Sequence, residues 1–347
     1  MTTTPSWPRL LDHLLEGHDL DADQAAALMR AWIGEGLEPV LTGALLAGLR
    51  AKGARGSELA AMAAVLREAA PLPPGRPKVP LVDTCGTGGS GIDSFNISTA
   101  VAFTAAACGA VVAKHGNRSA SGRVGSADVL EALGLDLAAP PERVLAALGP
   151  AGVTFLFAPG WHPALVGLAP LRRCLGVRTV FNQLGPLVNP LRPEAQVLGV
   201  ARPDQLDPMA EALARLGQGR AVVVHGHGGL DEATLCGPSE LRLVEKGEVR
   251  ADRLDPQALG LEHAPLEALI GGDLAVNRTI LEAVLQGGGS RAQREAVALN
   301  TALVLWAADR AATPEEALPL ALEALAAGTP WQRLETLREA LRPHPAG

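Results

Sequence analysis

LVDTCGTGGSGIDSFNISTA, residues 81–100, joins a short β-forming run to a helix-forming run through a loop that contains four glycines. A strand, a glycine-rich turn and a helix together form the repeating unit of α/β folds. Such a turn presents unpaired backbone N–H groups to anions where the helix begins. The loop has neither the dinucleotide GxGxxG spacing nor the Lys-Ser/Thr pair of a Walker loop. Taken alone, it is either an ordinary tight turn or a phosphate-binding loop.

The sequence after this stretch repeats the alternation of strand and helix. Amphipathic segments separate four further β-type runs, which are AVVAKHG, VTFLFAP, QVLGVA and RAVVVHG. The pattern predicts an α/β fold with a central, mainly parallel sheet flanked by helices. A polar stretch at residues 233–256 predicts short antiparallel strands with turns, and residues 273–341 return to a helical pattern.

The sequence before the stretch is helical throughout. Apolar residues recur three and four positions apart between residues 8 and 70. PLPPGRPKVP, residues 71–80, contains five prolines, which cannot continue a helix and which keep the chain extended. We therefore expect a small all-helical domain at residues 1–75 and a large α/β domain at residues 76–347.

The composition limits the class of protein. Hydrophobic residues make up 48% of the chain and aromatic residues only 3%, which predicts an aliphatic core and many helices. A net charge of −7 argues against general affinity for nucleic acid, because binding along phosphates needs a basic surface. The four cysteines form no CxxC pair, and no apolar run reaches membrane-spanning length. These features indicate a soluble, cytoplasmic protein without a nucleic-acid or membrane partner.

A second polar loop follows the next predicted strand. AKHGNRSASGRVGSADVLEALG, residues 113–134, carries charged and hydroxyl donors just before a helix-forming run. As a single loop it is also typical of a solvated surface. Two such loops at adjacent strand ends predict one ligand with several phosphates, because a single phosphate needs only one group of donors.

Acidic and basic residues suggest partners for such a ligand. Asp231 and Glu232 follow the last predicted parallel strand and suit Mg²⁺, although an Asp-Glu pair is also common on solvated surfaces. Arg172 and Arg173 lie late in a predicted helix, where they either interact with the helix C-terminus or hold a substrate carboxylate. The spacing does not decide which arginine faces a pocket. Cys85 is expected to be a small buried hydrophobe and not a nucleophile.

Several long motifs occur in a fixed order: GTGG, NIST, KHGNR, GSADVLEALG, HPA, PLRRCLGVRTVFNQLGPLVNP and GLDE. With them the chain, from about residue 11 to 341, resembles the anthranilate phosphoribosyltransferase family. The resemblance implies transfer of the phosphoribosyl group of phosphoribosyl pyrophosphate to anthranilate in tryptophan biosynthesis. It also implies a nucleoside phosphorylase type of fold, in which part of about 165–190 joins the small domain. Two Mg²⁺ ions and a homodimer formed through the small domain are further expectations.

The resemblance also implies the residues of the site. The residues expected to bind the two substrates are Gly86, Gly89, Ser90, Ser94, Asn96, Ile97, Ser98, Thr99, Lys114, His115, Gly116, Asn117, Arg118, Ser119, Ala120, Ser121, Gly122, Ser126, His162 and Arg172. The expected metal positions are Ser98, Asp231 and Glu232. The residues expected to carry catalysis are Arg172, Asn117 and His115, with His115 as a candidate proton acceptor.

Three positions depart from the family pattern. Ser90 stands where an acid is common, Gly122 stands where a second serine is common, and Ser94 replaces a threonine. Two other classes share the expected fold. A pyrimidine nucleoside phosphorylase would need a pocket for a nucleoside base and would use inorganic phosphate. A non-catalytic nucleic-acid-binding relative would carry a basic face and would lack the metal-binding acids or Arg172.

Overall fold

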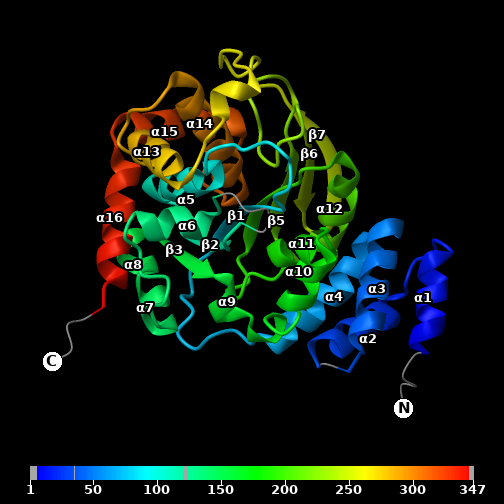
Figure 1. The fold of residues 1–347 in the computed structure, drawn as a ribbon. Helices are drawn as coiled ribbons and strands as arrows, with labels where there is room; N and C mark the ends of the chain where they lie inside the picture. The colour runs from blue at the N-terminus through cyan, green and yellow to red at the C-terminus, as the bar shows by residue number, and fades with distance from the viewer. Residues whose placement is uncertain (1–5, 35, 120–123, 344–347) are drawn as a thin grey trace.

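The computed structural model describes residues 6–34, 36–119 and 124–343. Within them, a seven-stranded sheet has the strand order β3-β2-β1-β4-β5-β6-β7 (Figure 1). The strands are β1 (Val82–Gly86), β2 (Val112–Gly116), β3 (Val153–Phe157), β4 (Ala195–Gly199), β5 (Arg220–His225), β6 (Ser239–Glu245) and β7 (Glu248–Leu254). Strands β1 to β5 pair in parallel, and β6 and β7 pair antiparallel. The predicted α/β fold with a mainly parallel sheet is confirmed.

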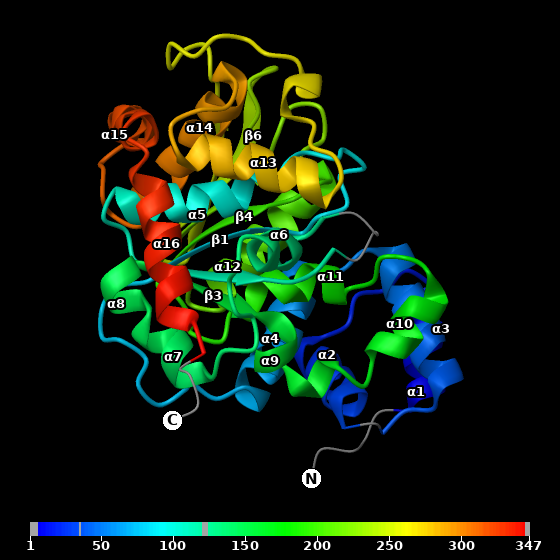
Figure 2. The ribbon, with the colours of Figure 1, turned by 60° about the vertical axis from the view of Figure 1, so that its left-hand side comes forward.

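Helices cover both faces of this sheet. The N-terminal helices are α1 (Trp7–Leu15), α2 (Ala22–Ile33), α3 (Pro39–Lys52) and α4 (Gly56–Ala69). The helices among and after the strands are α5 (Ile97–Ala107), α6 (Ser126–Ala132), α7 (Pro141–Ala146), α8 (Leu148–Ala151), α9 (Ala158–Trp161), α10 (Ala169–Leu175), α11 (Phe181–Leu184), α12 (Leu206–Arg215), α13 (Leu274–Leu285), α14 (Arg291–Ala307), α15 (Pro314–Ala326) and α16 (Thr329–Leu341). The N-terminal and C-terminal helices lie on opposite sides of the molecule (Figures 1 and 2).

The central strands separate two apolar cores. Side chains of one strand alternate between the faces, so Val222 and Val224 of β5 belong to one core and Val223 to the other. Helices α5 and α14 pack on the first core, and α4 and α12 pack on the second. Because both faces are covered, β4 and β5 are apolar along most of their length, whereas β1 includes the buried Asp83 and Thr84.

Local side-chain contacts determine where the N-terminal helices begin. The Asp21 carboxylate accepts a hydrogen bond from Gln24 N at 2.8 Å, and the Gln24 side chain accepts one from Asp21 N at 3.0 Å. This reciprocal capping fixes the first turn of α2. The fully buried Glu58 accepts from Leu20 N at 2.7 Å and from Lys52 Nζ at 2.9 Å, and so joins α4 to the turn before α2.

A segment from the middle of the chain packs against the N-terminal helices. Helix α10 contacts α3, and α11 contacts α4, so the two segments lie side by side (Figure 2). The glycine and two prolines of NQLGPLVNP, residues 182–190, are typical of an irregular connection, yet this stretch contributes to α11 and to a 3₁₀ turn at Gly185–Leu187. The Asn182 side chain accepts from Thr179 N at 3.0 Å and stabilises this first turn, which the punctuation of the sequence did not indicate.

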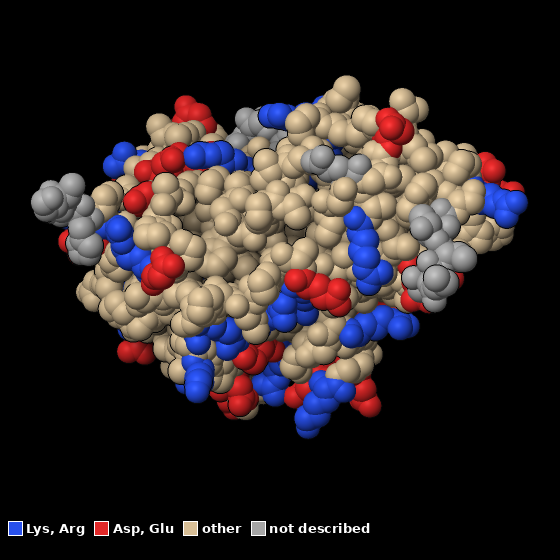
Figure 3. Space-filling model, turned by 90° about the horizontal axis from the view of Figure 1, so that it is seen from below, with Lys and Arg blue, Asp and Glu red and all other residues tan. Residues whose placement is uncertain are grey.

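The surface carries both signs of charge. On the face seen from below, Lys and Arg side chains are interspersed with Asp and Glu, without a continuous basic area (Figure 3). None of the helices in the described ranges combines the length and the apolar character needed to cross a bilayer.

Candidate active site

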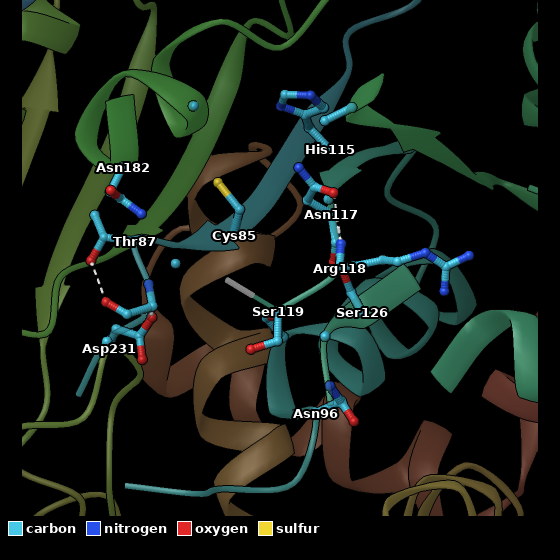
Figure 4. Close-up of a pocket in the computed structure, with 18 of the residues that line it drawn as sticks. Cys85, Thr87, Asn96, His115, Asn117, Arg118, Ser119, Ser126, Asn182 and Asp231 are labelled. Atoms are coloured by element: carbon cyan, nitrogen blue, oxygen red, sulfur yellow. Dashed lines mark hydrogen bonds between the residues drawn. The ribbon is translucent and has the colours of Figure 1, made fainter. Parts of the chain in front are cut away.

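A cavity of about 580 Å³ opens where β1 and β2 end. Ligands of open α/β sheets bind at this edge, because helix N-termini and loops meet there. We name Thr87–Gly91, which follows β1, the glycine loop. In Figure 4, Thr87 and Asp231 lie on one side of the cavity, and Asn117, Arg118 and Ser126 lie on the other. The two predicted loops therefore face one space.

Most of the predicted site residues line this cavity. They are Gly86, Gly89, Ser90, Ser94, Asn96, Ser98, Thr99, Lys114, His115, Gly116, Asn117, Arg118, Ser119, Ser126, His162, Arg172, Asp231 and Glu232. Ile97 differs, because its side chain is 1% exposed in the apolar core and its N–H donates to Phe95 O at 2.6 Å. Ala120, Ser121 and Gly122 lie outside the described residues.

The glycine loop is held by Asp231. Its Oδ2 accepts a hydrogen bond from Gly88 N at 2.8 Å, across a large separation in sequence. A β-carbon at Gly86 would collide with the same carboxylate, which explains why glycine stands there. Ser90 closes the loop, since its hydroxyl accepts from Ile92 N at 3.2 Å. Ser90, one of the three positions that depart from the family pattern, therefore has a structural contact in this chain.

Glu232 is a half-buried residue whose buried Oε2 lacks a partner among the described residues. Burial and the neighbouring Asp231 raise the pKa of Glu232 well above its usual value, while Lys114 opposes this shift. No group of three or more His, Cys, Asp or Glu side chains able to hold a metal occurs among the described residues. Mg²⁺ needs only one or two carboxylates besides water and phosphate, so this pair fits it.

The Lys114 side chain interacts electrostatically with both Asp231 and Glu232. Its buried ammonium donates to Thr84 O at 2.7 Å and to Ser98 Oγ at 3.1 Å. Burial lowers the pKa of Lys114, and Asp83 opposes that shift. The ammonium is therefore directed toward β1 and α5 and away from the rest of the second loop.

Side chains within the second loop, residues 113–134, form hydrogen bonds and ion pairs with one another. Asn117 Oδ1 accepts from Arg118 N at 2.7 Å, and Arg118 forms ion pairs with Asp128 at 2.7 Å and with Glu131 at 2.9 Å. These acids, Glu131 foremost, raise the pKa of Arg118, so its charge is already paired at the protein surface. At the base of the cavity, Asn96 donates to Val124 O at 3.1 Å.

Two histidines form the apolar end of the cavity. The rings of His115 and His162 meet edge to face with 5.2 Å between their centroids. Both are buried, and neither Nε2 has a hydrogen-bond partner among the described residues. Burial, then the neighbouring His162, lowers the pKa of His115 to about 3, and burial also lowers the pKa of His162. A ring with this pKa is a weak base, which speaks against His115 as the proton acceptor.

The structure distinguishes the two adjacent arginines. Arg172 lines the cavity with its guanidinium 5.1 Å from the ring centre of Phe181, whereas Arg173 is exposed. Burial, then the charge of Arg178, lowers the pKa of Arg172. Across the described ranges Arg172 has no ion pair, so its charge is available to a carboxylate ligand.

Some residues of the cavity were missed by the sequence analysis. Among them are Thr87, Arg178, Asn182 and Asn277. Arg178 is the third arginine of PLRRCLGVRT, but nothing in the sequence distinguishes it from a surface residue. Cys85, predicted to be a buried hydrophobe, is half-buried and lines the cavity; burial raises the pKa of its thiol far above the ordinary value, which disfavours it as a nucleophile.

A buried pair supports the strand ends beneath the cavity. Asn189 donates to Asp83 Oδ2 at 2.9 Å and to Ala113 O at 2.8 Å, and Asp83 accepts from His115 N at 3.1 Å. These contacts connect β1, β2 and the connection before β4. They hold both cavity-lining loops on a rigid base.

Known proteins match both parts of the chain. Residues 8–70 match the glycosyl transferase family helical bundle domain, and residues 78–330 match the glycosyl transferase family a/b domain. An anthranilate phosphoribosyltransferase of Synechococcus sp. (strain WH7803) is 65% identical over 344 residues, which is 99% of this chain and 99% of the relative. One of Parasynechococcus marenigrum (strain WH8102) is 68% identical over 338 residues, which is 97% of each chain.

Solved structures agree with this likeness. The crystal structure of anthranilate phosphoribosyltransferase from Thermus thermophilus has a TM-score of 0.88 at 46% identity, covering 96% of this chain and 99% of that one. The Saccharomyces cerevisiae enzyme in complex with PRPP and Mg has a TM-score of 0.83 at 24% identity, covering 96% and 97%, and shares the fold. Because the relatives match along nearly the whole length of the chain, this protein belongs to the anthranilate phosphoribosyltransferase family.

Proposed function

We propose that this protein transfers the phosphoribosyl group of 5-phosphoribosyl 1-pyrophosphate to the amine of anthranilate. The products are N-(5-phosphoribosyl)anthranilate and pyrophosphate, and the reaction serves L-tryptophan biosynthesis. One observation carries the proposal: a single cavity combines the glycine loop, the Asp231–Glu232 pair and the half-buried Arg172. These groups suit a polyphosphate, its metal ion and an aromatic carboxylate.

The same observation disfavours the two alternatives. A pyrimidine nucleoside phosphorylase binds a base without a carboxylate, and the buried charge of Arg172 would then have no partner. A nucleic-acid-binding relative would not need Asp231 and Glu232 next to the loop, and the charges on the face in Figure 3 are mixed. The names of the relatives also favour the transferase.

The residues of the acidic pair suit Mg²⁺. The buried Glu232 Oε2 has no partner within the described ranges, and a cation would relieve the repulsion between the two carboxylates. We propose that Asp231, Glu232 and Ser98 take part in holding Mg²⁺, with two ions in total. Bound Mg²⁺ supplies positive charge that stabilises the departing pyrophosphate.

The reaction breaks the bond between ribose C1 and pyrophosphate and forms a bond from C1 to the amine. The sugar becomes positive and the leaving group negative, so N–H groups of the glycine loop, as donors to the leaving group, would stabilise the change. Arg172 binds the carboxylate of anthranilate, and Asn117, which lines the same cavity, orients the ligand so that the amine faces C1. The amine attacks from the opposite face and inverts C1.

No strong base is required in this mechanism. After attack, the nitrogen of the aromatic amine carries an acidic proton, which water or a phosphate oxygen accepts. The pKa of His115, lowered to about 3, is compatible with a ring that stays neutral and orients anthranilate. We assign His115 and His162 to the contact with the aromatic ring.

The domain boundaries and the oligomeric state are part of the proposal. We propose a small domain of residues 1–75, joined by part of about 165–190, a large domain of residues 76–347, and a homodimer formed through the small domain. Apolar side chains on this side support the dimer, since Leu15, Val40 and Val177 are 66%, 87% and 58% exposed. Sedimentation equilibrium that gives the monomer mass at micromolar concentration would contradict it.

The loss of anthranilate fluorescence tests the function. We expect the signal to decay only when phosphoribosyl pyrophosphate and Mg²⁺ are both present, with release of pyrophosphate. If there were no decay, and if thymidine or uridine were instead cleaved by inorganic phosphate, the nucleoside phosphorylase would replace the transferase.

A further inference from the structure

Arg178 lies in the connection between α10 and α11, close in sequence to Arg172. Gly176 ends α10 in the left-handed conformation, with φ at 65°, and turns the chain back toward the cavity. The half-buried Arg178 side chain reaches the glycine loop. A residue of the anthranilate side therefore touches the loop proposed to bind pyrophosphate.

The contact involves a single peptide group. Arg178 Nη2 donates to Thr87 O at 2.5 Å, and the next N–H, that of Gly88, donates to Asp231 Oδ2 at 2.8 Å. A cation thus holds the oxygen of this peptide and an anion holds its nitrogen. Rotation of the peptide would break two charge-assisted hydrogen bonds, which are stronger than neutral ones.

The glycine loop needs such a restraint. Gly88, Gly89 and Gly91 all have positive φ, at 66°, 82° and 76°, and glycine loses more conformational freedom on ordering than any other residue. The Arg178 guanidinium also lies against Gly89, where a β-carbon would collide with it. Arg178 therefore packs against the loop, and glycine at this position leaves room for its guanidinium.

The N–H groups that follow the restrained peptide are positioned for a ligand. In the described part of the chain, the backbone N–H groups of Gly89, Ser90 and Gly91 donate to no protein acceptor. Successive N–H groups in a loop with positive φ form an anion-binding concavity. The direction in which they point depends on the orientation of the Thr87–Gly88 peptide before them.

We propose that Arg178 is a positioning residue for the phosphoribosyl pyrophosphate site, which fixes the Thr87–Gly88 peptide so that the following N–H groups converge on the pyrophosphate. The inference rests on the proposed function. Arg172 and Arg178 belong to one segment but serve different substrates: Arg172 contacts the anthranilate carboxylate, and Arg178 acts on the other substrate through the loop. The two arginines should therefore differ in which Michaelis constant they control.

Arg178→Met tests the inference, because it removes the donors and keeps a long side chain. The matched control is Arg173→Met, on the same segment but exposed. We expect Arg178→Met to raise the KM for phosphoribosyl pyrophosphate roughly tenfold or more and to change the KM for anthranilate less than about twofold. The melting temperature should stay near that of the wild type. The control should have wild-type constants.

The wild type is assayed first, since its inactivity would contradict the proposed function and not this inference. With an active wild type, equal rises of both KM values would show that Arg178 is only structural. A KM for phosphoribosyl pyrophosphate like that of Arg173→Met would also overturn the inference. If Arg178→Met does not fold, Arg178→Gln, which lacks the charge, replaces it under the same criteria.

Discussion

Replacing His115 by Asn tests whether this buried ring stays neutral in the folded protein. Burial and His162 lower its pKa to about 3, whereas the ordinary value is 6.5. Between these values the unfolded chain binds more protons than the folded one, so stability rises with pH. The contribution is fully present above about pH 6.5 and is lost as the pH falls toward about 3. At about 1.36 kcal/mol per pKa unit, this ring lowers the free energy of unfolding of the wild type by about 2 kcal/mol at pH 5, relative to pH values above 6.5.

Urea denaturation at pH 7 and at pH 5 measures this effect. We expect the free energy of unfolding to fall by about 2 kcal/mol more in the wild type than in His115→Asn. His18→Asn, at an exposed position, is the matched control and should follow the wild type. Equal losses in the wild type and His115→Asn would refute the lowered pKa. In that case His115 would return as a candidate proton acceptor.

Three further variants test the fold and the site. Glu58→Gln removes the buried one of the two carboxylates that pair with Lys52, Asp19 being the other, and should lower the free energy of unfolding by about 3 kcal/mol in urea, whereas the exposed Glu16→Gln should not. Arg172→Met should raise the KM for anthranilate roughly 30-fold, about 2 kcal/mol, and leave that for phosphoribosyl pyrophosphate unchanged; equal rises would contradict the assignment. Asp231→Asn should raise the Mg²⁺ concentration for half-maximal turnover with an unchanged circular dichroism spectrum. A wild-type Mg²⁺ response of Asp231→Asn would exclude Asp231 from the metal site.

The sheet was predictable because its signals are local. Strands β4 and β5, buried on both faces, are apolar along most of their length, and the glycines and polar residues at the ends of β1 and β2 mark the edge where ligands bind. The contact of α10 with α3 was not predictable from periodicity, because an apolar helix face does not specify its partner. The turn at α11 was not predictable, because Asn182 stabilises it by accepting a hydrogen bond from Thr179 N, and the same residue type also fits an irregular loop.

The site was predictable in its residues more than in its geometry. The two loops were identified from residue types, but the choice between Arg172 and Arg173 depends on how α10 is rotated, which only packing decides. The weak basicity of His115 also depends on burial and on His162, which is distant in sequence. Arg178 could not be identified, because its role arises from one backbone carbonyl on another segment.

Some glycines around the cavity lie where another residue passes close to the backbone. Gly86 of β1 and Gly199 of β4 face each other in the parallel ladder, and Asp231 passes over both, its side chain against Gly86 and its backbone against Gly199. A β-carbon at either glycine would displace Asp231 and with it the hydrogen bond from Gly88. The close approach of Asp231 to the sheet therefore requires glycine on both β1 and β4, independently of any phosphate ligand. The glycine-rich pattern resembles a phosphate-binding loop. In this chain, glycine is also needed so that Asp231, the proposed metal ligand, can lie against that loop.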